Sequence, residues 1–257
     1  MEHVNLGYRL NMILSLLEQK NLVPVKELKE LLGVSYETIR KDLITLEQNG
    51  LISRKHGGAA LNRNAVDNLG TPLIHTVESQ LARVQIAKEA AKQITTQPHT
   101  VVGLDVGNTV LHVARILAER ADLTVVTNSL SIVDLYSSLG NDRIYCVGGE
   151  LRNWDNGLYG DWAIQNLKSV SLSAVVLGTP GLSREGIGAL SYYDKDIKRV
   201  LVEKAKTCIV VADSSKLERT SFVQAVRWEK IDMLITDSGI KDEDRKAIEE
   251  QTNVIVV

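Results

Sequence analysis

Small polar residues and glycines follow several short apolar runs of the sequence, in positions where they could bind an anion. The run "TVVGLD" continues into "VGNTV", and "CIVVAD" continues into "SSKL". Gly107, Asn108 and Thr109 would open a helix after a strand, where backbone N–H groups and the helix dipole favour an anion such as phosphate. Lys216 is available as a counter-charge. Each loop taken alone is better explained as a tight strand-to-helix turn, but five such loops at one sheet edge favour a binding site.

A second group of polar side chains lies in "SYETIRKDL", residues 35–43. Ser35 is typical of a helix N-cap. The apolar stripe that such a helix needs for packing comes from other positions, namely Ile39, Leu43 and Leu46. Tyr36, Glu37 and Arg40 are left to point elsewhere, as base-reading side chains do at the start of a recognition helix. The simpler alternative is a solvated helix face of mixed charge, because Glu37 and Asp42 are acidic.

The surrounding segments favour the DNA-reading interpretation of this helix. "VPVKELKELLG" has a helical apolar period and stops at Gly33, and "LISRKHGGAAL" is typical of a short hairpin with basic residues. Helices with a tight turn between the second and third, followed by a hairpin, predict a winged helix-turn-helix. The basic residues of the hairpin suit phosphate contacts. The candidate DNA contacts are Ser35, Tyr36, Glu37, Thr38, Arg40, Lys41, Arg54, Lys55 and His56.

From residue 100 onward, short apolar runs alternate with helical stretches. Strands without polar alternation are buried on both faces, and strands interleaved with helices predict an open parallel sheet covered by helices. Ligands of such sheets bind beyond the carboxyl ends of the strands. Between the two parts, residues 62–82 are polar and contain Gly70 and Pro72, which predicts a linker leading into a helix.

Composition restricts the class of protein. The chain has 257 residues, a formal net charge of −2, and apolar and charged fractions of 44% and 24%, which are typical of a globular protein without a general affinity for polyanions. Cys146 and Cys208 lie in apolar runs that predict buried strands and reduced thiols. The N-terminus lacks the layout of a signal peptide, and no apolar run approaches a membrane span. We therefore expect a cytoplasmic protein without membrane contact.

Several enzymatic and metal-dependent chemistries lack their motifs. The sequence contains no GxxxxGK[ST], no GxGxxG in a strand-turn-helix context and no GxSxG. Its five histidines are scattered without the spacing of metal ligands. No cofactor, metal site or catalytic residue is predicted.

Two sets of motifs stand out in the sequence: the stretch "VPVKELKELLGVSYETIRKDLITLEQNGLISRKHGGA", and then, in order, "LDVGNT", "VTNS", "GGELR", "LGTPGLSREGIG" and "VVADSSKL". In these motifs the chain resembles a known family, the DeoR-type bacterial transcriptional regulators: the first stretch is similar to their N-terminal module and the others to motifs of their sensor domain. The resemblance implies a winged helix-turn-helix over residues 1–62, a linker over 63–82, and a Rossmann-like sensor and oligomerisation domain over 83–257, an open parallel sheet resembling ribose-5-phosphate isomerase. Members usually repress operons of sugar uptake and catabolism and respond to a phosphorylated sugar.

The resemblance also implies a set of effector-binding residues. The phosphate-proximal loop would comprise Asp105, Gly107, Asn108 and Thr109, and the neighbouring loops would supply Thr127, Asn128, Ser129, Gly148, Gly149, Gly178, Asp194 and Lys216. Asp105 could accept hydrogen bonds from ligand hydroxyl groups or cap the next helix. Asn108 stands where the family often has Thr or Ser, and Asp194 where it often has Glu, so the effector's identity and its phosphorylation stay open.

The main expectation is a DNA-binding regulator that binds double-stranded operator DNA and a small-molecule effector. One recognition helix reads few base pairs, so we expect a homodimer or homotetramer. The alternative from another class is a sugar-phosphate isomerase-like enzyme with an appended helix-turn-helix, which would need a general acid and base among Asp105, Glu150, Asp194 and Lys216. A third interpretation treats the N-terminal module as a protein-docking domain.

Overall fold

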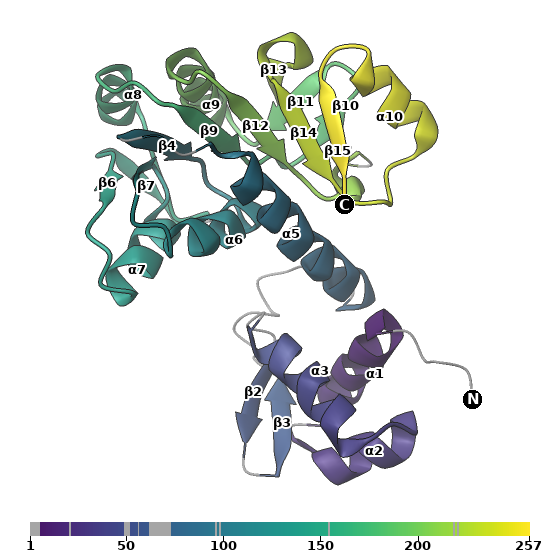
Figure 1. Ribbon diagram of the computed structural model, residues 1–257. Coiled ribbons are helices and arrows are strands. Elements are labelled where there is room, and N and C mark those ends of the chain that lie inside the picture. The colour runs from purple at the N-terminus through teal and green to yellow at the C-terminus, as the bar shows by residue number, and fades with distance from the viewer. Residues whose placement is uncertain are drawn as a thin grey trace. The chain divides into compact units, whose positions relative to one another are not determined.

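The structure is a computed structural model that describes residues 6–20, 22–48, 52–55, 57–61, 73–95, 97, 99–153, 155–217, 219 and 221–257 (Figure 1). The chain forms two compact units, Met1–Leu81 and Ala82–Val257. The division lies within the range 63–82 that the sequence assigned to a linker. Helix α5 begins at Leu73, so the described end of that range is helical, and residues 62–72 lie outside the described residues.

The N-terminal unit contains three helices and a small antiparallel sheet. Its elements are α1 (Leu6–Gln19), β1 (Val23–Pro24), α2 (Val25–Leu32), α3 (Tyr36–Gln48), β2 (Ile52–Lys55) and β3 (Gly58–Leu61). The strand order is β1-β3-β2. Gly33 ends α2 with a φ of 64°, which only glycine adopts without strain, and its N–H donates to Lys29 O at 3.0 Å. The predicted helices and hairpin of a winged helix-turn-helix are confirmed.

The core of this unit contains the stripe that the sequence predicts for α3. Ile39, Leu43 and Leu46 are buried together with apolar side chains from α1, α2 and the sheet. Asp42 is also buried and forms two hydrogen bonds with Arg9, from Nε to Oδ2 at 2.8 Å and from Nη2 to Oδ1 at 3.0 Å. This paired geometry is the strong form of an arginine–carboxylate bond, so it ties α1 to the recognition helix.

The C-terminal unit is built on a seven-stranded sheet in the order β15-β14-β12-β9-β4-β5-β6 (Figure 1). All of its strand pairs are parallel. The strands are β4 (Thr100–Leu104), β5 (Leu123–Thr127), β6 (Ile144–Cys146), β9 (Ala174–Leu177), β12 (Cys208–Val211), β14 (Met233–Thr236) and β15 (Asn253–Val256). The helices are α5 (Leu73–Gln93), α6 (Asn108–Leu117), α7 (Leu130–Ser138), α8 (Asp161–Lys168), α9 (Tyr192–Lys204) and α10 (Asp242–Glu249).

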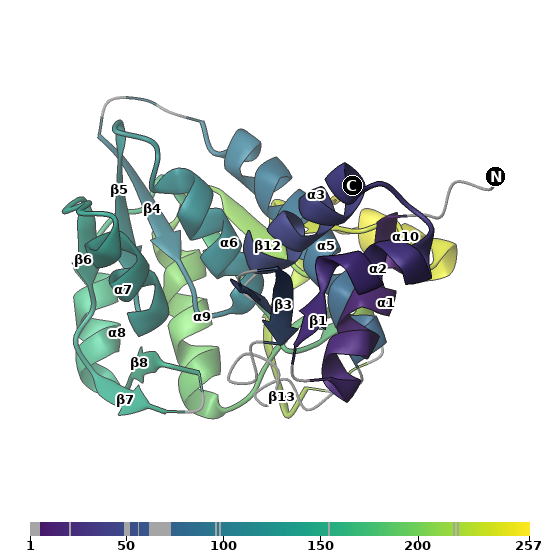
Figure 2. The same ribbon diagram turned by 90° about the horizontal axis from the view of Figure 1, so that it is seen from below.

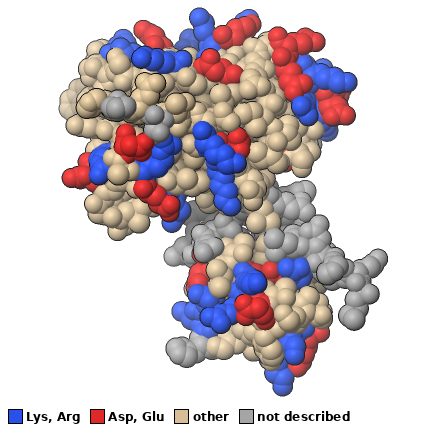
Figure 3. Space-filling model, in the orientation of Figure 1, with Lys and Arg blue, Asp and Glu red and all other residues tan. Residues whose placement is uncertain are grey.

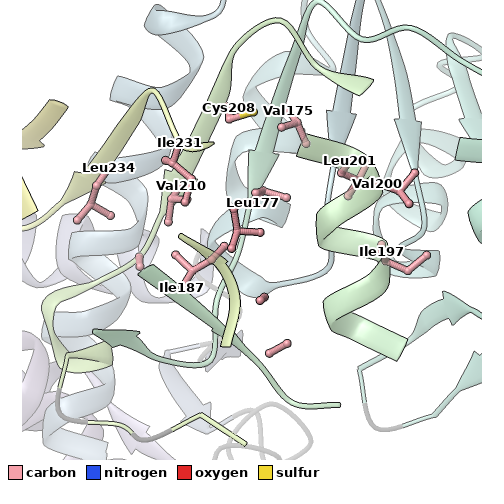
Figure 4. Close-up of a cluster of buried hydrophobic side chains, with 14 of the residues drawn as sticks. Val175, Leu177, Ile187, Ile197, Val200, Leu201, Cys208, Val210, Ile231 and Leu234 are labelled. Atoms are coloured by element: carbon pink, nitrogen blue, oxygen red, sulfur yellow. The ribbon is translucent and has the colours of Figure 1, made fainter. Parts of the chain in front are cut away.

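Two apolar layers cover this sheet, one on each face, and Figure 2 shows the C-terminal unit from a second direction. Helices α5, α6 and α7 pack on one face, and α8, α9 and α10 contribute to the other. Alternate residues of β9 point to opposite layers: Val175 and Leu177 lie in the layer with α9, shown in Figure 4, and Val176 lies in the layer with α6. This explains the continuous apolar runs of the central strands, and the predicted parallel α/β sheet is confirmed.

Smaller sheets flank the main one. β10 (Leu182–Ser183), β11 (Gly186–Ala189) and β13 (Val223–Arg227) form a three-stranded sheet, and β7 (Glu150–Arg152) with β8 (Gly157–Tyr159) forms a hairpin. Short 3-10 helices are η1 (Ser214–Lys216) and η2 (Trp228–Lys230). The prediction that both cysteines are buried is wrong for Cys146, which is exposed, because β6 is the edge strand and pairs only with β5.

Candidate functional site

The strand order places a reversal point between β4 and β9. From β4 the chain adds β5 and then β6 on one side, and it later returns to add β9, β12, β14 and β15 on the other side. The connections after β4 and β9 therefore leave in opposite directions, which opens a crevice at their carboxyl ends. Ligands of open parallel sheets bind in such a crevice.

A cavity of about 180 Å³ lies at this point. Six of the predicted effector-binding residues line it, namely Gly107, Asn108, Thr109, Gly178, Asp194 and Lys216. They come from the loops after β4, β9 and β12 and from the first turn of α9. The structure therefore brings together residues from three of the five loops that the sequence singled out, and their contact with an effector stays a prediction.

Two glycines shape the wall of the cavity where β4 and β9 end. Gly107 precedes α6 with a φ of 143°, a conformation that side chains rarely adopt. A Cβ atom on Gly178 would lie 2.8 Å from Val106 O, so only glycine lets the two loops approach this closely. The first backbone N–H groups of α6 are thereby left at the cavity wall, next to Asn108 and Thr109.

Asp105 does not line the cavity, because it is fully buried behind it. Its Oδ2 accepts from Lys198 Nζ at 2.5 Å and from Gly178 N at 3.3 Å. Lys198 Nζ also lies 3.0 Å from Oδ1 of Asp194. Asp105 thus does not cap α6, whose N-cap is Gly107; it holds Lys198, and its contact with an effector stays a prediction.

Burial and pairing set the charges of this cluster. Burial raises the pKa of Asp105 to about 6, although the Lys198 ammonium opposes the change. Burial alone would lower the pKa of Lys198, but the carboxylates of Asp105 and Asp194 outweigh it and raise the pKa above its ordinary value. Lys198 is therefore cationic at neutral pH and is already neutralised by its own neighbours.

The loops after β5 and β6 do not line the cavity but hold the β7–β8 hairpin. Thr127 Oγ1 donates to Leu104 O at 2.6 Å and accepts from Ser129 N at 3.0 Å. Asn128 Nδ2 donates to Leu158 O at 3.3 Å, and Asn128 O accepts from Leu158 N at 2.7 Å. Ser129 forms a β-bridge with Gly157. Asn128 and Ser129 therefore fix the strand that carries Tyr159 into the cavity wall, and Thr127 in turn holds Ser129.

Gly148 and Gly149 directly precede β7, the first strand of the same hairpin. A Cβ atom on Gly149 would lie 2.5 Å from Tyr159 O, and its φ is 152°. A Cβ atom on Gly148 would meet nothing within 4 Å. Gly149 therefore has a clear structural reason to be glycine, namely close packing against β8, and Gly148 has none.

Sequence reasoning missed five polar residues that line the cavity: Arg83, Asp155, Tyr159, Thr179 and Lys198. Lys198 is detectable as the residue four positions after Asp194 on one helix face. Asp155 accepts from Gly157 N at 2.9 Å and from the Tyr159 hydroxyl group. Arg83 lies on α5, before the first strand of the sheet, where a search of the loops that follow strands does not look.

Five of the predicted DNA-contacting residues lie around one groove of the N-terminal unit. A groove of about 360 Å³ is lined by Tyr36, Glu37, Arg40, Arg54 and Lys55, which places the start of α3 beside the hairpin. Lys41 is exposed, as are Arg40 and Lys55. Ser35 Oγ accepts from Thr38 N at 3.1 Å, which confirms Ser35 as a helix cap. His56 lies outside the described residues.

Two of the residues around this groove, Arg54 and Tyr36, also contact other side chains of the unit. Arg54 forms an ion pair with Glu47, with Nε 2.5 Å from Oε2, so it is engaged within the unit. Lys29, which the sequence did not single out, lies 4.6 Å from the centre of the Tyr36 ring. Figure 3 shows acidic and basic side chains side by side on the visible face of this unit, so that face is not uniformly basic.

The parts of the chain that the structure describes contain no helix that is long and apolar enough to cross a membrane. Within the same parts, no three His, Cys, Asp or Glu residues are grouped as a metal ion would require.

Comparison with solved structures gives a distant similarity to a D-ribose-5-phosphate isomerase in complex with phospho-erythronic acid. The sequence identity is 20%, the match covers 52% of each chain, and the TM-score is 0.39. This similarity is too low to support an inference about ligand or activity.

Comparison with curated proteins is more informative. The HTH-type transcriptional repressor GlcR of Bacillus subtilis (strain 168) is 34% identical over 236 residues, which is 89% of this chain and 87% of the relative. The glycerol-3-phosphate regulon repressor of Escherichia coli (strain K12) is 32% identical over 232 residues, or 90% of each. Both relatives are transcriptional repressors, which confirms the prediction of a regulator over an enzyme.

Family models match both units of the chain. Residues 9–65 match the DeoR-like helix-turn-helix domain, and residues 78–238 match the DeoR C terminal sensor domain. The predicted resemblance is confirmed over most of the sequence. The chain therefore belongs to the DeoR family of transcriptional regulators.

Proposed function

We propose that this protein is a cytoplasmic repressor of an operon for carbohydrate uptake or catabolism, controlled by a phosphorylated sugar. The N-terminal unit binds double-stranded operator DNA through the start of α3 and the β2–β3 hairpin. The phosphorylated sugar binds in the cavity at the carboxyl ends of β4, β9 and β12. The names of the relatives support the metabolic role, since one of them represses a glycerol-3-phosphate regulon.

The observation that carries the proposal is the chemical character of the cavity. The start of α6 and Lys216 offer an anion site, while Asp155 and Asp194 offer acceptors for hydroxyl groups. A phosphorylated sugar has one anionic end and several hydroxyl groups, so its chemistry matches both halves. The volume of about 180 Å³ suits a small metabolite better than a nucleotide.

The oligomeric state is part of the proposal. One recognition helix and one hairpin contact too few base pairs for useful specificity, so the protein acts as a homodimer or homotetramer on half-sites spaced by whole turns of DNA. Exposed apolar side chains such as Tyr145 and Trp162 on the C-terminal unit support self-association. Light scattering tests this directly, and a monomer at micromolar concentration with and without DNA would contradict it.

Ligand binding is tested by thermal-shift screening followed by calorimetry. The panel contains glucose 6-phosphate, fructose 1-phosphate and sn-glycerol 3-phosphate, each beside its unphosphorylated parent. We expect one phosphorylated compound to bind and its parent to bind much more weakly. Thr109→Val removes a hydroxyl group and Lys216→Ala removes a charge, and each should weaken that binding. Absence of binding to the whole panel would contradict the proposal.

A further inference from the structure

Helix α5 joins the two units of the chain and also reaches the cavity. It runs without interruption from Leu73 to Gln93, and the division between the units falls between Leu81 and Ala82. Arg83 follows this division by two residues, and its side chain lines the cavity. The rest of the cavity lining comes from the chain after residue 105. Arg83 is therefore the residue of α5 that lines the cavity.

Arg83 is held in this position by a carboxylate that follows a central strand of the sheet. Its Nε lies 3.1 Å from Oδ2 of Asp213, a residue that follows β12. Both side chains are largely buried, with 15% of Arg83 and 3% of Asp213 exposed. Burial alone would raise the pKa of Asp213, but the Ser215 hydroxyl group, Arg83 and Lys216 outweigh it and hold the pKa below its ordinary value. Asp213 is thus a carboxylate at neutral pH.

Asp213 faces two cations. Lys216, three residues further along, also lines the cavity and makes no ion pair with any residue in the described part of the chain. Burial lowers the pKa of Lys216, and the nearby Arg219 and Arg83 lower it further, while Asp213 opposes them. Arg83 and Lys216 therefore share one carboxylate, which leaves positive charge at the cavity wall that an anion could neutralise.

The guanidinium of Arg83 has donors left for such an anion. Within the described residues its hydrogen bond goes from Nε to Asp213, whereas an arginine carries five N–H donors in all. The terminal amino groups can form a paired contact with a phosphate, which is a stronger contact than a single bond to a neutral group. An anion beside Lys216 would attract the guanidinium through these free donors, and a paired contact with it would outweigh and weaken the single bond from Nε to Asp213.

We propose that Arg83 contacts the anionic group of the effector. When the effector binds, Arg83 exchanges its contact with Asp213 for a contact with the effector, and this exchange transmits effector binding to α5. The inference rests on the proposed function, since it needs an anionic ligand in this cavity. A ligand shifts a conformational equilibrium only through contacts that differ between the two states. The contact of Arg83 differs in this way between the two states. Helix α5 joins Arg83, along the chain, to the DNA-binding unit.

The experiment compares four variants of the full-length protein with the wild type. Arg83→Gln removes the charge, Arg83→Lys keeps the charge but loses the paired geometry, and Asp213→Asn removes the competing carboxylate. Lys92→Gln is the control, because Lys92 lies on the same helix, is exposed and does not line the cavity. The probes are glucose 6-phosphate, fructose 1-phosphate and sn-glycerol 3-phosphate. Calorimetry gives their affinity, and fluorescence anisotropy gives the change in DNA affinity that each causes.

With a probe that binds the wild type, we expect Arg83→Gln to lose about tenfold or more in probe affinity, the scale of one charged hydrogen bond. Arg83→Lys should recover part of that loss. Asp213→Asn should bind the probe at least as well as the wild type but transmit a smaller change to DNA affinity. Lys92→Gln should match the wild type in both measurements.

Failure of the inference and failure of the proposed function give different results. If a probe binds the wild type and both Arg83 variants bind it equally well, the role of Arg83 is wrong while the cavity remains the effector site. If Asp213→Asn transmits the full change to DNA, the exchange is wrong. If no probe binds the wild type, the proposed function fails and the inference fails with it.

Discussion

Lys198 lies between the carboxyl groups of Asp105 and Asp194, and this decides which side chains are left to face a ligand. The two carboxyl groups compensate the charge of Lys198 in a buried position, so the three side chains form the rigid base of the cavity. Asp194 is held further, because its Oδ2 accepts from Leu190 N at 3.0 Å and its N–H donates to Ser191 Oγ at 3.1 Å. The positive charge that an anionic ligand could pair with is therefore that of Arg83 and Lys216 and not that of Lys198.

The proposed DNA-reading groove of the N-terminal unit offers a matched pair of basic residues. Arg40 is on the recognition helix and Lys55 on the hairpin, and both line the groove of the N-terminal unit. Arg40→Ala should cost about 1–3 kcal/mol of operator binding and relax base preference at one position. Lys55→Ala should weaken binding to all sequences alike and reduce the salt slope by about one unit. A gel-shift series in salt measures both, and unchanged DNA retention in both variants would rule out this face.

His112 on α6 should make the stability of the sensor unit depend on pH. Burial lowers its pKa, and the neighbouring Arg115 and Arg83 lower it further. The unfolded chain takes up a proton near pH 6.5, whereas the folded protein does so only at lower pH. The stability contributed by neutral His112 is therefore complete above about pH 6.5 and is lost as the pH falls below it, by at most about 1.4 kcal/mol per pH unit.

The test is the difference between the wild type and His112→Gln in chemical unfolding between pH 7 and pH 5. The variant should lose less stability on acidification than the wild type. The difference between the two proteins is needed because Asp105 has the opposite effect on stability. Burial raises its pKa to about 6, so on acidification the folded state takes up this proton before the unfolded state does, which favours folding. Parallel curves for the two proteins would show that His112 is not responsible.

At the scale of elements, the β7–β8 hairpin is the part of the cavity wall that does not belong to the main sheet. It carries Asp155 and Tyr159 to the cavity and is fixed by the loops after β5 and β6. Those loops leave the sheet on the far side of the reversal point, so they cannot reach the cavity themselves. The small polar residues of the loop after β5 contact the hairpin, and the hairpin forms part of the cavity wall.

Two adjacent glycines test this arrangement. A Cβ atom on Gly149 would lie 2.5 Å from Tyr159 O at a φ of 152°, so Gly149→Ala should cost about 1–3 kcal/mol of stability and displace the hairpin. Gly148→Ala is the control, because a Cβ atom there meets nothing within 4 Å. Thermal unfolding and calorimetric binding of sugar phosphates measure both effects. Equal behaviour of the two variants would show that the close contact with β8 is not needed.

The sequence predicted the elements better than their spatial order. The helical period of α3 predicted the burial of Ile39, Leu43 and Leu46, and the unbroken apolar runs predicted strands covered on both faces. The loops after strands were correctly expected at one edge, because parallel strands end on the same side. Which of those loops would meet at the cavity depends on strand order, and local patterns do not contain it.

Residues that act through other residues were the hardest to predict. Asp105 follows a strand like its neighbours in sequence, yet it is buried beneath the cavity because Lys198 of a distant helix reaches it. Arg83 belongs to a helix whose pattern predicts packing, and only the fold brings Asp213 to it, 130 residues later in the chain. Both pairings join segments that are far apart, so spacing along the chain gives no signal of them.

Control by an effector requires the two units of the chain, the sensor unit and the DNA-binding unit, to influence each other. Helix α5 belongs to both units along the chain, and Arg83 connects it to the cavity. If the effector changes DNA affinity, then DNA must change effector affinity by the same factor. A coupling of about 1–3 kcal/mol, or roughly 5–150-fold, is the usual range for such a link.

The most direct test is the DNA affinity of the full-length protein with and without a phosphorylated sugar. The duplex is selected by the protein from a pool of random sequences, and its Kd is measured by fluorescence anisotropy at fixed salt. We predict that a sugar phosphate bound in the cavity changes this Kd by roughly 5–150-fold, and that the duplex changes the sugar phosphate's own Kd by the same factor. A sugar phosphate that binds tightly and leaves the Kd of the duplex unchanged would contradict the proposed control of DNA binding by the effector.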